Sequence, residues 1–418
     1  MLDLKYLRDN QAQAEAALNK RLRPEDFSLP EIFALDDKRR ELISQVEGLK
    51  AERNKGSKVK PDEVTIKKMK DLGEEIKKIE EELNKVETEL KDKMSALPNL
   101  PADDVKAGGK ENNEVVYTFG TQPQFNFEPK DHVELATKLG IIDYERAAKM
   151  SGSGFWIYKG AGALLEWALL NYFIDQHTKR GYTFIIPPFL LNEASAYASG
   201  HLPKFRDDLF WTQDKLCLNA TSEMMLGNYH RDEILAEDEL PKKYFAYSPC
   251  FRREAGSYRQ EERGMIRGHQ FNKVELFQYT KPEDSWSAFA ELRKIAEDLI
   301  RGLGLHFQTS QLAAGDCSAA MAKTVDLEVW IPSMKIYKEV SSISNALDYQ
   351  ARRGNMRFKN SITKQNDFPH TLNASGLATS RLLPAILEQF QQADGSVIIP
   401  KILRQYLPVK MKKIVPQS

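Results

Sequence analysis

The sequence is poor in cysteine and in metal-binding patterns. Its 418 residues include only three cysteines, Cys217, Cys250 and Cys317, and no CxxC pair. This scarcity argues against a disulfide framework and a zinc ribbon, and it favours a reducing compartment. The seven histidines form no HExxH motif. His269 and His370 are therefore expected to be core residues, or to support a site from behind.

Long apolar runs and net charge are also missing. The start, "MLDLKYLRDN", has no apolar signal segment, and "GALLEWALLNYF" is too short to span a membrane and contains Glu166. We therefore expect a cytoplasmic protein that does not bind a membrane. Sixty lysines plus arginines balance sixty aspartates plus glutamates, so any site for a polyanion must be local. The length and the 41% hydrophobic content predict two or more domains.

Tryptophan and tyrosine are absent from residues 32–94, where the apolar residues have coiled-coil spacing. The second half steps by 3, 4, 3 and 4 residues through Ile76, Ile79, Leu83, Val86 and Leu90. Because "NKGSKVKPDE" interrupts the pattern as a turn would, we expect an antiparallel two-helix coiled-coil arm. Helices of about 25 to 30 residues would project about 40 Å. The expected organisation is a helical domain over residues 1–100, a Pro- and Gly-containing linker over 101–116, and a second domain over 117–418.

The positive charge of this arm is concentrated near its turn. Between Lys50 and Lys70 eight cations oppose three carboxylates, whereas "EEIKKIEEELNKVETEL" is mixed to acidic. The basic tip is suited to contacting phosphates. A solvated spacer is the alternative that charge alone leaves open. The candidate phosphate-binding residues are Arg53, Lys55, Lys58, Lys60, Lys67 and Lys68.

The remainder of the chain predicts a mixture of strands and helices. Strands are expected in "GYTFIIPPFLL", "KLCLNA", "YFAYSPCF", "VELFQYT", "TVDLEVWIP" and "IYKEVSS", and helices in "GALLEWALLNYFIDQHTKR" and "SRLLPAILEQFQQ". The strands do not alternate regularly with helices, and the runs 244–251 and 274–279 face each other across one long loop. We therefore expect an α+β fold with an antiparallel sheet flanked by helices.

The loop between those two runs is rich in arginine. "PCFRREAGSYRQEERGMIRGHQF" contains Arg252, Arg253, Arg259, Arg263 and Arg267 among Glu254, Glu261 and Glu262. Guanidinium groups bind phosphate through two hydrogen bonds and stay charged, so this loop fits a triphosphate. A solvated charged turn is the alternative interpretation.

Two further segments give weaker signals. Glu339 is expected at a strand end with Ser341 and Ser342 behind it, and such oxygen ligands suit magnesium that is shared with substrate phosphates. An exposed glutamate on an edge strand is the alternative. In "NASGLATSRLLPAILEQF", Gly376 precedes Arg381 at the start of a helix, where an arginine can reach an anion. A cation on the helix surface is the alternative.

The order of these motifs resembles one known family. "GYTFIIPP", then the arginine segment, then "GLATSR" ahead of a helix resemble the three ordered motifs of class II aminoacyl-tRNA synthetases. "GHLPKFRDDLF", "NATSE", "HQFNKVELF", "KTVDLEVWIP", "EVSSISNALDYQARR" and "HTLNASGLA", with the arm and linker, are similar to seryl-tRNA synthetases over essentially the whole chain. The resemblance implies a class II catalytic domain that forms seryl-adenylate from L-serine and Mg²⁺-ATP. The serine is then transferred to the 3′-terminal adenosine of tRNA(Ser).

The resemblance also implies roles for individual residues. Arg252 would bind the α-phosphate and stabilise the charge that develops there, Phe271 would stack on adenine, and Arg381 would contact the γ-phosphate. The implied ATP-binding residues are Arg252, Arg253, Glu254, Arg267, Gly268, Phe271, Glu339, Val340, Ser341, Ser342 and Arg381, of which Arg252, Glu254 and Arg381 are the catalytic ones. The implied metal ligands are Glu339 and Ser342, and the implied serine-binding residues are Thr221, Ser222, Glu223, Glu275 and Ser375.

In that family the arm grips the long variable arm of serine tRNA, usually across a homodimer whose interface includes "GYTFIIPP". The selenocysteine tRNA, tRNA(Sec), is a second candidate substrate. Three residues depart from the expected pattern. Ala374 stands where glycine is usual, Ser380 stands where glycine or proline is common, and Gly268 replaces a larger apolar residue. Two other interpretations are a related ligase that loads a carrier protein and an inactive homologue that only binds RNA.

Overall fold

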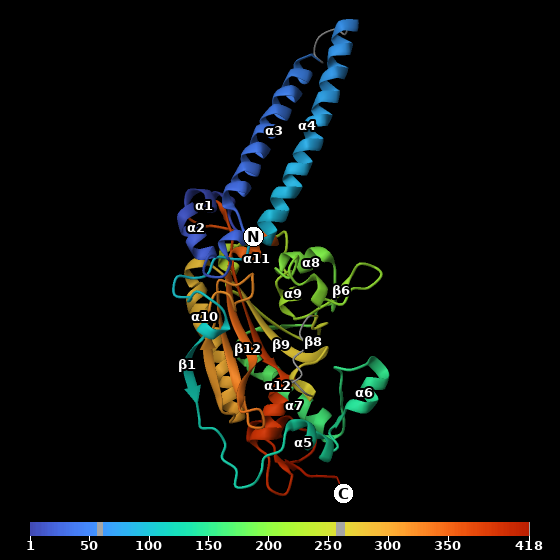
Figure 1. Ribbon diagram of the computed structural model, residues 1–418, viewed down its shortest axis with the longest axis vertical. Coiled ribbons are helices and arrows are strands. Elements are labelled where there is room, and N and C mark those ends of the chain that lie inside the picture. Colours follow the sequence, from blue (N-terminus) through green and yellow to red (C-terminus); the bar gives the residue numbers. More distant parts are fainter. Residues whose placement is uncertain (57–61, 256–263, 418) are drawn as a thin grey trace. The chain divides into compact units, whose positions relative to one another are not determined.

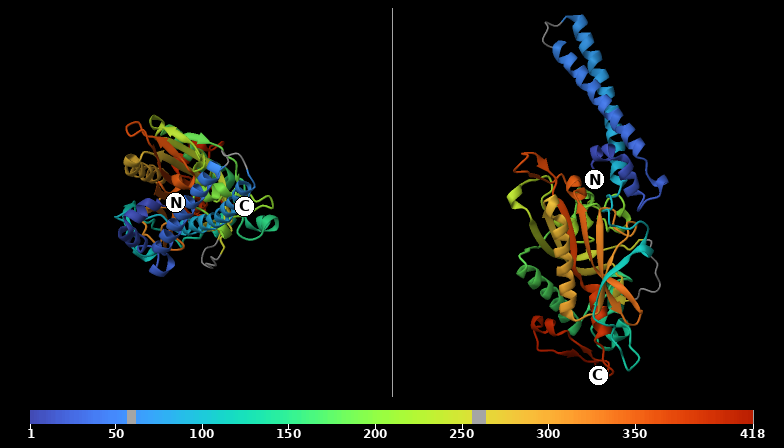
Figure 2. Two further views of the ribbon diagram at one scale, coloured as in Figure 1. Left: turned by 90° about the horizontal axis from the view of Figure 1, so that it is seen from above. Right: turned by 90° about the vertical axis from the view of Figure 1, so that its left-hand side faces the viewer.

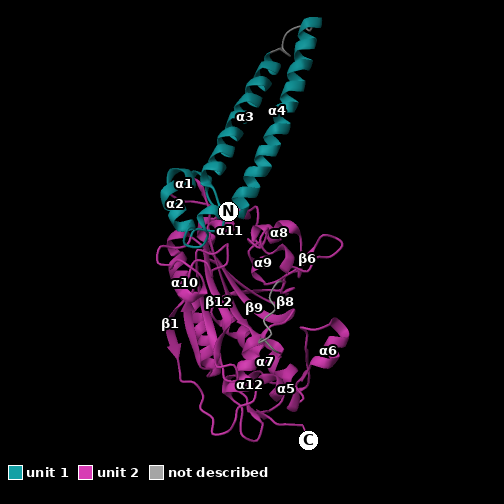
Figure 3. Cartoon of the chain, in the orientation of Figure 1, with its two compact units in different colours: residues 1–100 teal, residues 101–418 magenta. Residues whose placement is uncertain are grey.

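The chain forms two compact units, residues 1–100 and 101–418, which Figure 3 colours separately. The computed structural model describes residues 1–56, 62–255 and 264–417. The candidates Lys58 and Lys60, and the loop residues Arg259, Glu261, Glu262 and Arg263, lie outside the described residues. No helix in the described part of the chain is long and apolar enough to cross a membrane.

The first unit consists of two short helices and a long antiparallel helix pair (Figure 1). The short helices are α1 (Leu4–Asp9) and α2 (Gln11–Leu18), and the long ones are α3 (Leu29–Gly56) and α4 (Glu63–Ala96). Leu42 and Val46 on α3 and Ile76 and Leu90 on α4 are buried between the helices, as the coiled-coil spacing predicts. The expected arm is confirmed, and α4, with 34 residues, is longer than expected.

An eight-stranded sheet forms the centre of the second unit. Every neighbouring pair is antiparallel except β4 and β8, which run parallel. The antiparallel sheet expected from the sequence is therefore confirmed, with one parallel edge strand added. In spatial order the strands are β1 (Glu114–Phe119), β10 (Phe307–Gln311), β11 (Lys323–Ile331), β12 (Ile336–Leu347), β15 (His370–Ala378), β9 (Gln270–Thr280), β8 (Lys242–Phe251) and β4 (Thr183–Ile185).

Helices pack against the sheet, and the largest core lies between them. In the right-hand view of Figure 2, the gold helix α10 (Ser285–Leu303) lies along the strands. Two more helices, α7 (Ala161–Lys179) and α12 (Thr379–Gln389), contribute buried side chains to the same core. The remaining helices are α5 (His132–Lys138), α6 (Tyr144–Ser151), α8 (Glu193–Ala198), α9 (Glu223–Leu226) and α11 (Tyr349–Arg353). Three short strand pairs in the described residues are β2 (Ile142–Asp143) with β3 (Ile157–Tyr158), β5 (Leu190–Leu191) with β6 (Cys217–Leu218), and β16 (Val397–Ile398) with β17 (Lys413–Ile414). A three-stranded sheet has the order β14 (Asn366–Asp367), β13 (Arg357–Lys359) and β7 (Ile234–Ala236).

The segment expected as a linker is hydrogen-bonded to the second unit. The amide of Ala102 donates to the Ala322 carbonyl at 2.9 Å, and the Ala314 amide donates to the Lys106 carbonyl at 2.8 Å. The last residues of the segment enter β1 at the edge of the sheet. Backbone hydrogen bonds thus fix this Pro- and Gly-containing segment against the rest of its unit.

Candidate active site

The period-two alternation of β9 and β15 creates a polar face opposite the main core. On β9, Val274 and Leu276 enter the core with α7, α10 and α12. Their neighbours Lys273 and Glu275 therefore point to the opposite face. On β15, Leu372 and Ala374 are core residues, which turns Asn373 and Ser375 the same way. This pattern also explains Ala374, because its side chain is fully buried in the core and faces away from the polar surface.

A cavity of about 440 Å³ lies on this polar face. Thr221, Glu223, Asn373 and Ser375 line it, together with residues of the arginine segment. A smaller cavity of about 40 Å³ is lined by Gly268, Phe271, Val340, Ser380 and Arg381. The two cavities share six lining residues, Arg252, Glu254, Arg267, Lys273, Glu339 and Ser375. Most of the expected ATP-binding and serine-binding residues therefore line one continuous region.

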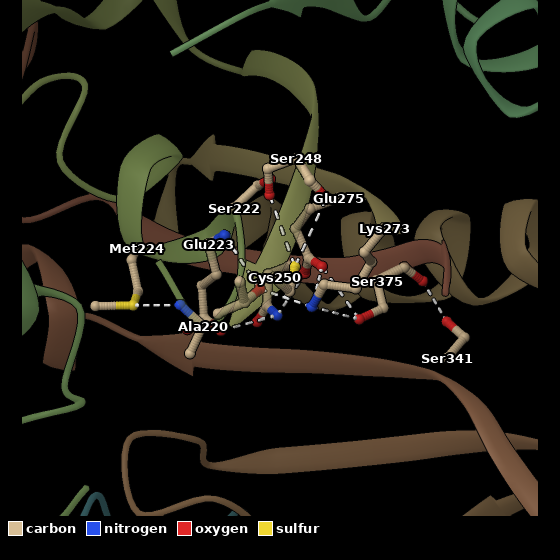
Figure 4. Close-up of polar contacts among 12 residues, drawn as sticks. Ala220, Ser222, Glu223, Met224, Ser248, Cys250, Lys273, Glu275, Ser341 and Ser375 are labelled. Carbon is tan, nitrogen blue, oxygen red and sulfur yellow. Dashed lines mark hydrogen bonds and ion pairs between the residues drawn. The ribbon is translucent and has the colours of Figure 1, made fainter. Parts of the chain in front are cut away.

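A buried network of charged and polar groups supports the larger cavity (Figure 4). Lys273 Nζ lies 2.7 Å from Glu275 Oε2 and donates to Thr221 Oγ1 at 2.6 Å. Ser375 Oγ donates to Glu275 Oε2 at 3.1 Å, and Asn373 Nδ2 donates to Glu275 Oε1 at 3.0 Å. Glu275 is fully buried and lies behind the lining residues, so within the protein it acts on the cavity through Lys273, Asn373 and Ser375.

The second carboxylate of this region, Glu223, differs from Glu275 because it lines the cavity itself. Gln350 Nε2 donates to Glu223 Oε1 at 2.7 Å, and Asn373 Nδ2 donates to its Oε2 at 3.3 Å. Burial, followed by the charge of Glu275, raises the pKa of Glu223 to about 7, although Lys273 and Gln350 oppose the shift. A cationic group in the cavity would favour the ionised form of Glu223.

The arginines and a phenylalanine lie at the junction of the two cavities. Arg252 Nε donates to the Ala220 carbonyl at 3.3 Å, and its guanidinium lies 5.2 Å from the ring centroid of Phe271. Arg267 Nε donates to Glu254 Oε2 at 2.8 Å, so this carboxylate fixes the arginine in place.

Arg381 lies at the first turn of α12 and lines the smaller cavity. Its Nε donates to the Ile266 carbonyl at 3.1 Å and its Nη1 donates to the Glu339 carbonyl at 2.7 Å. The Glu339 carboxylate is 3.4 Å from the same nitrogen. The alternative of a helix-surface cation therefore does not describe Arg381, because two carbonyl groups hold it against the site.

Two carboxylates and a hydroxyl form an oxygen-rich group where β11 and β12 pair. Asp326 pairs with Ser342 in the sheet, and Ser342 Oγ donates to Asp326 Oδ1 at 2.7 Å. Burial, followed by the neighbouring Glu339, raises the pKa of Asp326 well above its usual range. Hard oxygen donors of this kind fit a divalent cation. No group of three or more His, Cys, Asp or Glu side chains suited to a metal occurs among the described residues, so the remaining ligands would come from substrate and water.

Some expected residues do not line either cavity. Ser222 is buried, with its hydroxyl 2.7 Å from that of Ser248. Ser341 is buried and donates to the Ser375 carbonyl. Arg253 is held by its backbone amide, which donates to the Asp208 carbonyl at 2.9 Å. All three lie beside lining residues in the sequence, which is why sequence motifs alone group them with the site.

Sequence reasoning missed several residues of this region, of which four bear on the argument. Lys273 and Asn373 line the larger cavity, and each lies two positions from a predicted residue on the same strand, so alternation gave a signal for both. His201 also lines it, but it follows α8 in a loop that offers no periodicity. Asp326 was passed over because it lies between apolar residues of a buried strand.

Gly268 lacks the space for a side chain. A Cβ atom there would lie 2.1 Å from Cζ3 of Trp156. Because Trp156 occupies the volume behind Gly268, a larger residue at 268 would displace the tryptophan. This contact is the physical reason why the departure from the expected pattern is tolerated.

The tip of the arm carries exposed cations. Arg53 and Lys55 near the end of α3, and Lys67 and Lys68 near the start of α4, are all exposed. Lys68 Nζ also pairs with Glu52 at 2.7 Å. Such exposed cations are available to phosphate groups with little desolvation cost.

Comparisons with known proteins agree with this geometry. Residues 1–101 match the seryl-tRNA synthetase N-terminal domain, and residues 205–390 match the tRNA synthetase class II core domain (G, H, P, S and T). Serine–tRNA ligase 2 of Clostridium acetobutylicum is 55% identical over 97% of this chain and 99% of its own, and serine–tRNA ligase of Thermodesulfovibrio yellowstonii is 46% identical over 98% and 99%. The structure of seryl-tRNA synthetase from Pyrococcus horikoshii complexed with ATP superimposes with a TM-score of 0.91 at 32% identity, over 100% of both chains. The chain therefore belongs to the seryl-tRNA synthetase family.

Proposed function

We propose that this protein activates L-serine with ATP and transfers the serine to the 3′-terminal adenosine of tRNA(Ser). The observation that carries the proposal is the junction of a cavity containing Glu223, Thr221 and Ser375 with the arginine-lined site of Arg252 and Arg381. The first end suits a small zwitterion with a hydroxyl group, and the second suits a triphosphate. Relatives with matching domains are named serine–tRNA ligases.

Activation requires positioning and charge stabilisation, and no protein nucleophile. The serine carboxylate attacks the α-phosphorus, and pyrophosphate leaves. We assign Arg252 to the α-phosphate, because it lines both cavities and so lies between the two substrates. Arg267, fixed by Glu254, and Arg381, fixed by two carbonyl groups, bind the leaving phosphates. Held cations of this kind stabilise the transition state without reorganisation.

Magnesium is the metal that fits the oxygen donors of Glu339 and Ser342, while Asp326 orients the Ser342 hydroxyl. When bound, it would neutralise negative charge on the ATP phosphates. On the nucleotide, Phe271 offers the ring face opposite to Arg252 for adenine to stack on. Gly268 and Val340 border the same small cavity, and we assign it to the nucleotide.

Discrimination among amino acids follows from the polar lining. Glu223 binds the substrate ammonium group, and Ser375 with the Lys273–Glu275 pair behind it binds the hydroxyl group. Alanine would enter but leave these buried groups without a partner, which can reduce activation by orders of magnitude. Threonine adds a methyl group and must be rejected by size.

Binding of tRNA is assigned to the arm. The exposed cations Arg53, Lys55, Lys67 and Lys68 are suited to the phosphates of the long variable arm, and recognition of this type depends on shape and salt. tRNA(Sec) is a second substrate under this proposal, because contacts of this kind read the shape of the RNA.

A homodimer is the proposed assembly. On the edge strand β4, Phe184 is 39% exposed, and Ile186 just beyond the strand is 73% exposed. Trp167 on the adjacent helix α7 is 54% exposed. Large apolar side chains on an unpaired sheet edge favour association with a second copy. We further place the protein in the cytoplasm, since its three cysteines form no disulfide bonds with one another and the substrates are cytoplasmic.

The test is ATP–pyrophosphate exchange with each of the twenty amino acids, without tRNA, for the wild type and for Arg252→Ala. We expect exchange with serine alone and its loss in the variant. Exchange with a different amino acid would redirect the substrate assignment to the cavity around Ser375. Absence of exchange from folded protein would contradict the enzyme proposal and favour an RNA-binding homologue.

A related carrier-protein ligase is disfavoured by the arm. The helix pair of α3 and α4 offers long reach and an exposed basic tip, which a small carrier protein does not require. Measuring serine transfer to a tRNA transcript and to a carrier protein distinguishes the two functions, because each function requires a different acceptor.

A further inference from the structure

His201 lines the larger cavity but has no role in the reaction described so far. It follows α8, in a wall that also contains Ser199 and Gly200. Burial and, after it, the charges of Arg252 and Lys273 lower the pKa of its imidazole. Because His201 and Arg252 line the same cavity, His201 lies in the part of the site to which the proposed function assigns the α-phosphate.

The hydrogen bonds around Ser199 determine which imidazole nitrogen carries the proton. Ser199 Oγ donates to the Ala196 carbonyl at 3.1 Å and lies 3.0 Å from His201 Nδ1. A hydroxyl group has one hydrogen to donate, and we assign it to the Ala196 carbonyl, which can only accept. With this assignment Nδ1 of His201 donates to Ser199 Oγ, and the lone pair of the imidazole is on Nε2.

The imidazole is also neutral. Burial, together with the charges of Arg252 and Lys273, lowers the pKa of His201 to about 3. At neutral pH, Nε2 is consequently a hydrogen-bond acceptor and cannot donate. It has no hydrogen-bond partner within the described residues.

The chemistry of the substrates restricts what this acceptor can bind. The phosphates of ATP and the serine carboxylate are acceptors, so they cannot pair with a lone pair on Nε2. The serine ammonium is assigned to Glu223, whose negative charge makes it the stronger partner, and the serine hydroxyl group is assigned to Ser375 with the Lys273–Glu275 pair. The remaining donor that must reach the reacting carbonyl carbon is the attacking hydroxyl group of the tRNA.

We infer that Nε2 of His201 accepts a hydrogen bond from the 3′-hydroxyl group of the terminal adenosine and aims its oxygen at the seryl carbonyl carbon. The inference rests on the proposed function. In the step concerned, the hydroxyl oxygen forms the ester bond, the bond between the carbonyl carbon and the phosphate oxygen breaks, and AMP leaves with the electron pair. The hydroxyl proton is released to water. Because the imidazole is a weak base, His201 orients the hydroxyl group and does not retain the proton.

Measuring the two half-reactions separately distinguishes a role of His201 in the transfer to tRNA from a role in binding serine or ATP. We would measure serine-dependent ATP–pyrophosphate exchange, and separately the single-turnover transfer of serine from preformed adenylate to tRNA(Ser), in His201→Ala and His201→Gln. Exchange should change by less than about twofold, while transfer in His201→Ala should slow by about five- to tenfold, as expected for one lost hydrogen bond. Because glutamine has an acceptor oxygen, His201→Gln should retain part of the transfer rate. His370→Gln, which removes a histidine that lines neither cavity, is the matched control.

Each outcome has a definite meaning. A parallel fall in exchange and transfer would overturn the inference, because His201 would then contact serine or ATP, and an unchanged transfer rate would overturn it as well. If the unaltered protein shows no serine-dependent exchange, the proposed function fails first, and this inference fails with it. Nitrogen NMR of labelled protein, with His201→Ala to assign the signals, gives a readout independent of activity. A proton on Nε2 would contradict the assigned tautomer.

Discussion

Replacing Lys273 by methionine tests how much the buried ion pair between Lys273 and Glu275 contributes to the stability of the folded protein. The lysine side chain is 6% exposed and that of its partner Glu275 is 0% exposed, and the two charges are 2.7 Å apart. Methionine has a similar length and fills a similar volume, so the change removes the charge without opening a large cavity. Glu275 is then left as a buried carboxylate without a cation.

The size of the effect follows from what remains around Glu275. Breaking a buried ion pair on one side costs about 3 to 5 kcal/mol. Ser375 and Asn373 still donate hydrogen bonds to Glu275 in the variant, so we expect the lower value, about 3 kcal/mol. For a unit of this size the loss corresponds to a fall in melting temperature of about 6 °C, at about 2 °C per kcal/mol.

Thermal unfolding followed by circular dichroism at pH 7.5 measures this loss. The control is Lys294→Met, which removes an exposed lysine from an i,i+4 pair with Asp298 and should shift the melting temperature by about 1 °C or less. The double variant Lys273→Met/Glu275→Leu should recover much of the loss, because an apolar pair avoids the buried charge. A melting temperature of Lys273→Met within about 1 °C of the wild type would refute the reasoning.

Three further predictions follow from single contacts. Burial raises the pKa of Glu166 from 4.5 to about 7. Ionisation of Glu166 therefore has no effect on the stability of the folded protein below pH 4.5 and reduces that stability by its full amount above pH 7. Glu166→Gln keeps an acceptor for Asn272 and Thr379 and should raise the melting temperature at pH 8 but not at pH 4.5; an equal shift at both would contradict this cause. Arg381→Ala should raise the KM for ATP in pyrophosphate exchange by about tenfold or more and leave the KM for serine nearly unchanged; a serine-specific defect would argue against its assignment. The combined change of Arg53, Lys55 and Lys67 to alanine should lower the slope of log affinity for tRNA against log salt by about 2 to 3, with exchange unaffected, and an unchanged slope would remove the arm from the interface.

The extent to which the sequence predicts the site differs from one strand to the next. On β8 and β9 the antiparallel pairing was predicted from two apolar runs flanking one loop, and the register pairs Tyr244 with Phe277. The strand β15 was not expected as a strand, although its residues "HTLNASGLA" were recognised as a motif. Helix α10 was not expected either, although its buried residues Phe289, Leu292, Ala296 and Leu299 recur at helical spacing.

Local patterns in the sequence determined the coiled-coil arm, the antiparallel sheet and the arginine-rich segment. Each depends on residues close together in the chain, where periodicity and charge are directly visible. Pairing between strands distant in sequence decided which polar residues face one another: Lys273 reaches Ser375 across 102 positions, and Glu223 reaches Gln350 across 127. It also decided that Glu275 lies behind the cavity. The tautomer of His201 depends on a loop turn that brings Ser199 Oγ to its ring, and only tertiary structure fixes such a contact, since a loop has no period from which the direction of a side chain could be predicted.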